Sequence, residues 1–125
     1  MANPVKWLED HPLLASNLAV LYAGAIFILS SMPKVPKPPG PWYTSFLIHF
    51  IEYLGFGFIV LIAVRGNKAA KNPLVFAVAI CILYAFSDEI HQYFVPERVA
   101  DIWDVFFDSM GSATGAAAAN TLRRT

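Results

Sequence analysis

Four apolar stretches, separated by short polar connections, account for most of the 125-residue chain. They cover residues 13–31, 44–64, 74–94 and 101–122. Because a helix needs about 20 residues to cross a hydrocarbon core about 30 Å thick, each stretch is long enough to span a membrane. The first three are strongly apolar, whereas the fourth is acidic at its start and rich in Gly and Ala, so it is assigned from its context. The pattern predicts an all-α fold, an integral membrane four-helix bundle that forms one domain over residues 1–125.

The connections contain residues that stop helices. Residues 32–41 include five prolines, which exclude a helix or an inner strand. Residues 65–73 form a short basic loop, and residues 95–100 form a tight turn centred on Pro96. Near the start of the chain, Pro12 suits a first helical turn, and Asp10 is a candidate for the cap of that helix. The first stretch is too long for the apolar region of a signal peptide, so we expect it to be retained.

The composition agrees with a membrane protein. Hydrophobic residues make up 57% of the chain and charged residues 14%, with a mean hydropathy of +0.52, whereas soluble domains carry about 25% charged residues. The formal net charge is zero, so no overall field favours nucleic acid as a partner. Cys81 is the single cysteine, which excludes an intramolecular disulfide.

The basic residues predict an orientation in the plasma membrane. With four spans, the two termini and the loop at 65–73 share one side, which carries six basic residues: Lys6, Arg65, Lys68, Lys71, Arg123 and Arg124. The other side carries three: Lys34, Lys37 and Arg98. Because positive residues favour the cytoplasm, we expect both termini to be cytoplasmic.

Ionisable residues gather near the opposite, outer side of this predicted bundle. At 1.5 Å per residue, those of the second, third and fourth stretches lie within roughly 12 Å of that side. Helical spacing places them in three stripes: His49, Glu52 and Tyr53; Tyr84, Asp88, His91 and Gln92; and Asp101, Asp104, Asp108 and Ser112. A charged side chain costs about 2.5–3.5 kcal/mol at the centre of a lipid-facing helix. We therefore expect the stripes to face one another around an outward-opening polar pocket.

Three segments carry a resemblance to a known family: HFIEY, SDEIHQYFVPER and DVFFDSMGSATG, within roughly residues 46–116. Together they resemble the VanZ-like family, named for a protein associated with teicoplanin resistance. The family pattern usually has a Pro-Gly-Arg turn and an Asn in the last segment; here Glu97 replaces the Gly, and Asp108 stands where Asn is common. The resemblance implies a small integral membrane protein, associated in some members with resistance to a cell-wall antibiotic. It implies no settled reaction.

The candidate catalytic layer consists of four residues. Asp88 and His91 lie one turn apart and form a candidate acid–base pair, because a carboxylate beside an imidazole suits it to proton transfer near neutral pH. Glu52 and Asp104 complete the layer. The alternative interpretation places Asp88 and Glu89 in water at the membrane interface, with no chemical role.

The candidate binding residues are led by Arg98, whose planar guanidinium holds phosphate or carboxylate in bidentate fashion. The others are Gln92, His49, Glu89 and Asp108. A divalent cation is a candidate cofactor, because hard cations prefer several carboxylate oxygens, and the metal-binding residues stay open.

Each of these residues also has a structural interpretation. Arg98 would form an ion pair with Asp101 or Asp104, Asp101 would cap the fourth helix, and His49 would bond to Glu52. Asp88 would bond to Gln92. Gly111 and Gly115 form a small-xxx-small pattern, which lets a neighbouring helix pack closely.

The leading hypothesis is an envelope protein that binds the headgroup of a polar lipid or lipid-linked cell-wall precursor in this pocket. Hydrolysis or transfer at a phosphate is an extension that stays open. The alternative is a structural or accessory membrane module whose buried charges lock the bundle, and a closed layer without a cavity would favour it. A proton- or ion-coupled carrier is a third hypothesis, which the one-sided pocket and the lack of an internal repeat disfavour.

Overall fold

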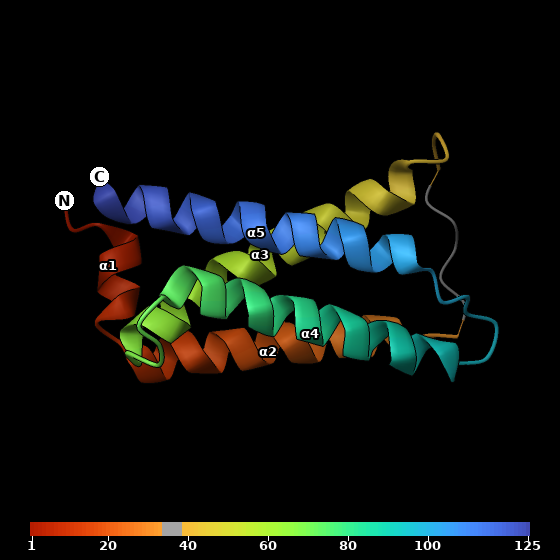
Figure 1. Cartoon of the computed structure of the whole chain (residues 1–125), viewed down its shortest axis with the longest axis horizontal. Coiled ribbons are helices and arrows are strands. Elements are labelled where there is room, and N and C mark those ends of the chain that lie inside the picture. The colour runs from red at the N-terminus through yellow and green to blue at the C-terminus, as the bar shows by residue number, and fades with distance from the viewer. Residues whose placement is uncertain (34–38) are drawn as a thin grey trace.

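The computed structural model of the chain describes residues 1–33 and 39–125, and within that range it consists of helices joined by turns and loops, with no strand. Five helices follow one another: α1 (Pro4–Glu9), α2 (Pro12–Ser30), α3 (Thr44–Gly66), α4 (Pro73–Tyr93) and α5 (Ile102–Arg124). Helices α2–α5 run along the long axis of the molecule, and α1 lies across one end (Figure 1). The ends of α2–α5 fall within two residues of the ends of the four predicted stretches. Helix α1 was not predicted.

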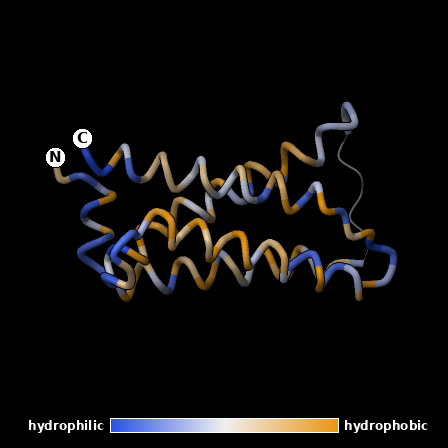
Figure 2. The backbone as a smooth tube through the Cα atoms, viewed as in Figure 1, coloured by the Kyte–Doolittle hydropathy of each residue, from blue (hydrophilic) through white to orange (hydrophobic). Residues whose placement is uncertain are grey.

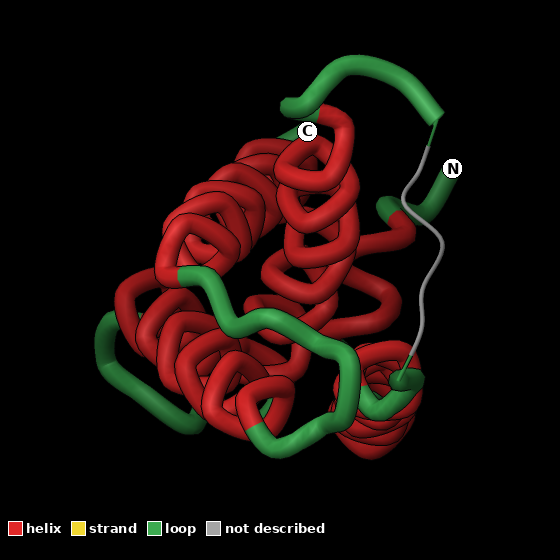
Figure 3. Tube along the Cα trace, turned by 90° about the vertical axis from the view of Figure 1, so that its right-hand side faces the viewer, coloured by secondary structure: helices red, strands yellow, loops and turns green. Residues whose placement is uncertain are grey.

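The two ends of the bundle differ in what they carry. One end, here called the terminal end, holds both chain termini, α1 and the loop between α3 and α4 (Figure 1). The other, here called the turn end, holds the turn at 95–100, and Figure 3 views the molecule from this side. Residues 34–38 of the predicted proline-rich connection, including Lys34 and Lys37, are outside the described part of the chain.

Three of the long helices, α2, α3 and α4, are apolar and long enough to cross a membrane, judged over the described residues. Hydrophilic residues gather toward the ends and connections (Figure 2). Large apolar side chains also point outward along these helices, among them Leu13, Val20, Leu21, Val75 and Leu83. An outer surface of this kind suits lipid rather than water.

Helix α1 is built from local caps. The side chain of Asn3 accepts hydrogen bonds from the backbone N–H groups of Val5 and Lys6, and Pro4 occupies the first helical position. Asp10 ends this helix, so the prediction that Asp10 caps α2 was wrong. His11 takes that cap position and its side chain makes no capping bond.

The terminal end is tied together by polar contacts between distant parts of the sequence. Glu9 forms an ion pair with Arg123 at 2.7 Å and a longer one with Arg65 at 3.9 Å. Arg65 also donates a hydrogen bond to Asn120. These contacts hold α1 against the ends of α3 and α5.

Helices α3 and α5 form the closest contact in the bundle, and glycines make it possible. A Cβ atom at Gly111 would fall on the carbonyl oxygen of Phe50, and one at Gly115 on that of Leu54. On the facing helix, a Cβ at Gly57 would meet the backbone of Ser112. The close packing predicted from the small-xxx-small pattern is therefore confirmed, and it places the acidic stripe of α5 directly against α3.

Candidate functional site

A cavity of about 210 Å³ lies near the turn end, here called the polar cavity. Helices α2 and α3 diverge toward this end (Figure 1), and the cavity has walls from α2, α3 and α4 and from the turn at 95–100. Its lining consists of Leu29, Ser30, Ser45, Ile48, His49, Glu52, Asp88, Gln92 and Arg98. Five of the nine predicted site residues thus line one cavity: His49, Glu52, Asp88, Gln92 and Arg98.

Helical spacing explains how these side chains converge. His49 and Glu52 are three residues apart on α3, and Asp88 and Gln92 are four apart on α4, so each pair shares a helix face. Arg98 comes from the turn, where Glu97 has a φ of 65°. This left-handed conformation favours glycine, the residue that the VanZ-like resemblance leads one to expect at this position.

His49 joins α3 to α5 at the back of the polar cavity. Its Nδ1 atom is hydrogen-bonded to Oδ1 of Asp108 at 2.9 Å, and its Nε2 atom lies 3.7 Å from Oδ2 of Asp104. The side chain of Asp108 is only 1% exposed, so the imidazole is its main polar partner. Because His49 turns toward α5, the expected bond between His49 and Glu52 does not form. Asp104 and Asp108 consequently lie behind His49 rather than on the cavity wall.

Asp88 and Gln92 connect α4 to α2. The amide of Gln92 donates to Oδ2 of Asp88 at 3.4 Å and to the hydroxyl of Ser30 at 3.3 Å. The predicted pairing of Asp88 with Gln92 is therefore confirmed. The other carboxylate oxygen of Asp88, Oδ1, is buried and has no hydrogen-bond partner among the described residues.

Arg98 is not used for a structural ion pair. No carboxylate of the described residues lies within ion-pair distance of its guanidinium, so the expected pairing with Asp101 or Asp104 was wrong. Its Nη2 atom donates a weak bond of 3.4 Å to the carbonyl of Leu29, and its Nε atom is buried without a partner. The guanidinium is therefore available to a ligand in the cavity.

Asp101 and Glu89 instead fix the start of α5. The side chain of Asp101 accepts from the backbone N–H of Trp103 at 2.9 Å, as the capping interpretation predicted. The backbone N–H of Asp101 in turn donates to Oε2 of Glu89 at 2.8 Å. Glu89 is thus occupied with the connection between α4 and α5, and it does not line the polar cavity.

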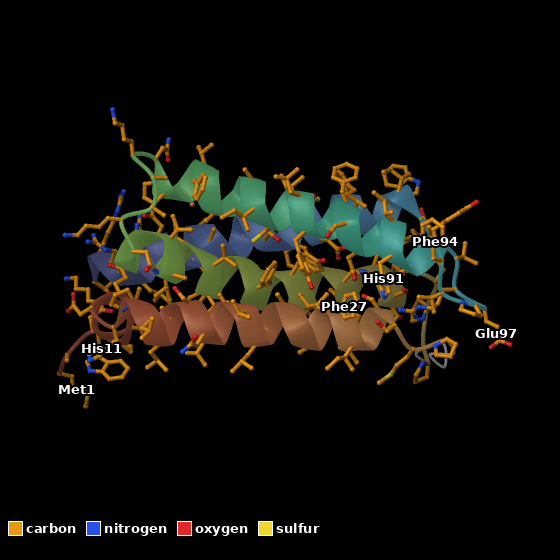
Figure 4. The ribbon with its side chains drawn as sticks, turned by 90° about the horizontal axis from the view of Figure 1, so that it is seen from below. Met1, His11, Phe27, His91, Phe94 and Glu97 are labelled. Atoms are coloured by element: carbon orange, nitrogen blue, oxygen red, sulfur yellow. The ribbon has the colours of Figure 1, made fainter. Side chains whose placement is uncertain are left out.

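His91 lies on the side of α4 that meets α2. Its Nε2 atom is hydrogen-bonded to the hydroxyl of Ser31 at 2.9 Å, and its ring stacks on Phe27 (Figure 4). No hydrogen bond or ion pair joins it to Asp88. The expected acid–base pair of Asp88 and His91 is therefore not met in this geometry.

The sequence did not single out the contribution of α2 to the cavity. Ser30 and Leu29 come from this helix, and Ser45 comes from the first turn of α3. A signal was present in the polar pair Ser30–Ser31 at the end of a stretch of apolar residues. Within residues 1–33 and 39–125, no group of three or more His, Cys, Asp or Glu side chains is arranged to hold a metal ion.

Comparison with known families gives one match. A family model described as VanZ/LLP1 matches residues 15–123, which covers α3, α4, most of α2 and α5, and all residues of the polar cavity. Neither the curated proteins nor the solved structures contain a match to the chain.

Proposed function

The chain belongs to the VanZ/LLP1 family, and on this premise we propose that it is a four-span membrane protein whose polar cavity binds the headgroup of a membrane lipid or lipid-linked envelope precursor. The observation that carries the proposal is a cavity with charged walls between helices that are apolar on their outer faces. Unpaired ionisable groups are costly inside a membrane and usually serve a function. A charged layer with a purely structural role would have no such cavity.

The fourth span in this proposal is α5. Its 23 residues correspond to about 35 Å at 1.5 Å per residue, which matches the thickness of the hydrocarbon core. Its hydropathy is low because it carries carboxylates and small residues, and Asp104, Asp108, Gly111 and Gly115 all pack against α3 instead of lipid. With four spans, the excess of basic residues at the terminal end supports a cytoplasmic location for both termini. The polar cavity then opens in the outer half of the plasma membrane.

In this proposal Arg98 contacts the anionic part of the headgroup. Its guanidinium lines the cavity and has no carboxylate partner, and planar guanidinium groups bind phosphate in bidentate fashion. Glu52, Asp88 and Gln92 supply the other polar groups of the wall, while His49 is held in place by Asp104 and Asp108. The link to teicoplanin resistance, which the VanZ-like resemblance implies, belongs to this proposal as a consequence of binding an envelope lipid.

Catalysis at a phosphate is a second, more specific proposal. The geometry limits which of the candidate catalytic residues could act in the cavity. Of the four candidate catalytic residues, Asp88 and Glu52 line the cavity, Asp104 lies behind His49, and His91 faces α2. A reaction in the cavity would therefore use Asp88 or Glu52 as its base.

The alternative is a structural or accessory module. It is supported by the bonds that join His49 to Asp108 and Gln92 to Ser30, since these lock helices together. It leaves unexplained why Arg98 has no carboxylate partner, and Oδ1 of Asp88 no hydrogen-bond partner, among the described residues. Headgroup binding accounts for both.

The test is the variant Arg98→Gln. Charge-assisted hydrogen bonds are worth about 1.5–3 kcal/mol, so we expect the purified variant to retain co-purifying lipid about 10-fold or more weakly than the wild type. Retention is measured by native mass spectrometry of the full chain released from detergent micelles.

The matched control is His91→Phe, at the same end of the bundle. His91 faces α2 and a phenyl ring preserves its stacking on Phe27, so lipid retention should stay at the wild-type level. Circular dichroism confirms that both variants fold. Equal lipid retention by folded Arg98→Gln and the wild type would refute headgroup binding at this cavity.

A further inference from the structure

The walls of the polar cavity carry both a positive and a negative region, which come from different elements. Arg98 contributes the cation from the turn, and Glu52 and Asp88 contribute two carboxylates from α3 and α4. Asp88 is 6% exposed and its Oδ1 atom has no hydrogen-bond partner. The Glu52 carboxylate also makes no hydrogen bond to any described residue, although the backbone carbonyl of Glu52 accepts one from Tyr22.

His49 cannot supply the missing partner for these carboxylates. Both of its ring nitrogens already face α5, toward Asp108 and Asp104. The cavity wall therefore holds two carboxylates and one guanidinium, and neither carboxylate forms an ion pair with a described residue. A buried carboxylate that stays ionised in a membrane protein needs a charged or hydrogen-bonding partner. A ligand that brings both an anion for Arg98 and a cation for Glu52 and Asp88 would give these three charged side chains partners of opposite charge.

The free carboxylate oxygens also select the type of cation. A primary ammonium group has three N–H donors and can bond to two carboxylates at once. A quaternary ammonium group has none and is usually held by aromatic rings. The cavity lining contains no Phe, Tyr or Trp, so the chemistry of the wall favours a primary amine.

The size of the cavity limits the ligand further. Its volume of about 210 Å³ is below the roughly 300–1,000 Å³ of pockets for drug-sized ligands. A disaccharide–peptide precursor does not fit such a space, whereas a phosphate joined to a short amine does. Leu29 and Ile48 line the same cavity and are about half exposed, so they give an acyl chain an apolar path to the bilayer.

We propose, as an extension that rests on the proposed lipid binding, that the polar cavity selects a phosphoethanolamine headgroup. The phosphate lies against Arg98, and the primary ammonium lies between Asp88 and Glu52. The headgroup thereby places a group of opposite charge beside each charged side chain of the wall, and the lipid enters sideways between α2 and α3.

The experiment offers the purified full-length protein, in detergent micelles, equal amounts of phosphatidylethanolamine, phosphatidylcholine and phosphatidylglycerol with identical acyl chains. Bound lipid is counted by native mass spectrometry. We expect phosphatidylethanolamine to be preferred by about 10-fold over the other two. In Asp88→Asn and Glu52→Gln this preference of about 10-fold should be lost, because each variant removes one carboxylate partner of the ammonium group. Glu97→Gln removes a carboxylate from the same end outside the cavity, and it should keep the preference.

The outcomes separate this inference from the proposed function. Binding of all three lipids without preference, but weakened by Arg98→Gln, would overturn the headgroup assignment and leave lipid binding intact. No retention of any lipid would overturn both. A last arm adds water-soluble phosphoethanolamine: displacement of the lipid only at a large excess supports a lipid ligand. If phosphoethanolamine displaced the lipid at equal concentration, the cavity would still recognise this chemical group. The natural ligand would then be the soluble molecule and not a lipid.

Discussion

Gly115→Ala is expected to disrupt the contact between α3 and α5 and to be the most destabilising single methyl addition in the bundle. The new Cβ would fall on the carbonyl oxygen of Leu54, which belongs to the backbone of α3 and cannot rotate away. Overpacking of this kind costs typically 1–3 kcal/mol, and more where backbone must move, so we expect a loss of about 3 kcal/mol. Unfolding of the full chain in mixed micelles, followed by circular dichroism, measures it.

Gly24→Ala is the matched control for this prediction. Gly24 lies in the middle of α2, and a Cβ atom there meets nothing within 4 Å. Alanine has the higher helix propensity, so this variant should be as stable as the wild type or more stable, by up to about 1 kcal/mol. If both variants shifted the unfolding transition equally, close packing of α3 on α5 would not be what holds the bundle together.

His49→Leu is the second substitution with a large expected effect. It removes the imidazole from between two carboxylates and leaves Asp108, which is 1% exposed, without its hydrogen-bond partner. Breaking a buried charge pair by removing one partner costs about 3–5 kcal/mol, so the variant should be strongly destabilised. The free energy of unfolding in the same micelles is the measurement.

The double variant His49→Leu/Asp108→Leu isolates the contribution of the pair. Because it leaves no uncompensated carboxylate at this position, its loss of stability should be smaller than the sum of the two single losses by about 1 kcal/mol or more. Additive losses would mean that His49 and Asp108 contribute independently and that the bond across α3 and α5 has no net role.

The long helices could be predicted from the sequence because their signals are local. Runs of about 20 apolar residues, ended by the prolines at 32–41 and 95–100, set the bounds of α2 to α5 almost to the residue. Helix α1 gave no such signal. Its six residues are too few for a hydrophobic period, and it is held by the cap at Asn3 and by Glu9, whose partner Arg123 is 114 residues away.

Helical spacing predicted which site residues share a helix face, but it could not predict how the helices turn toward one another around the site. Spacing places Asp88, His91 and Gln92 on neighbouring positions of one helix, but it does not give the rotation of that helix against its neighbours. In the structure Asp88 and Gln92 turn to the cavity, while His91 turns to Phe27 and Ser31. The role of Ser30 depends on how α2 packs beside α4, which no pattern within α2 contains.

The most direct test of headgroup binding is a contact between Arg98 and a lipid phosphate in a bilayer. Solid-state NMR detects it as ³¹P dephasing of ¹⁵N-labelled guanidinium signals, in membranes that contain both phosphatidylethanolamine and phosphatidylglycerol. Arg98 is the single arginine outside the terminal end, and its signal is assigned by its loss in Arg98→Gln. We predict strong dephasing of the Arg98 guanidinium by lipid phosphorus, and its absence in folded protein surrounded by lipid would contradict the proposed function.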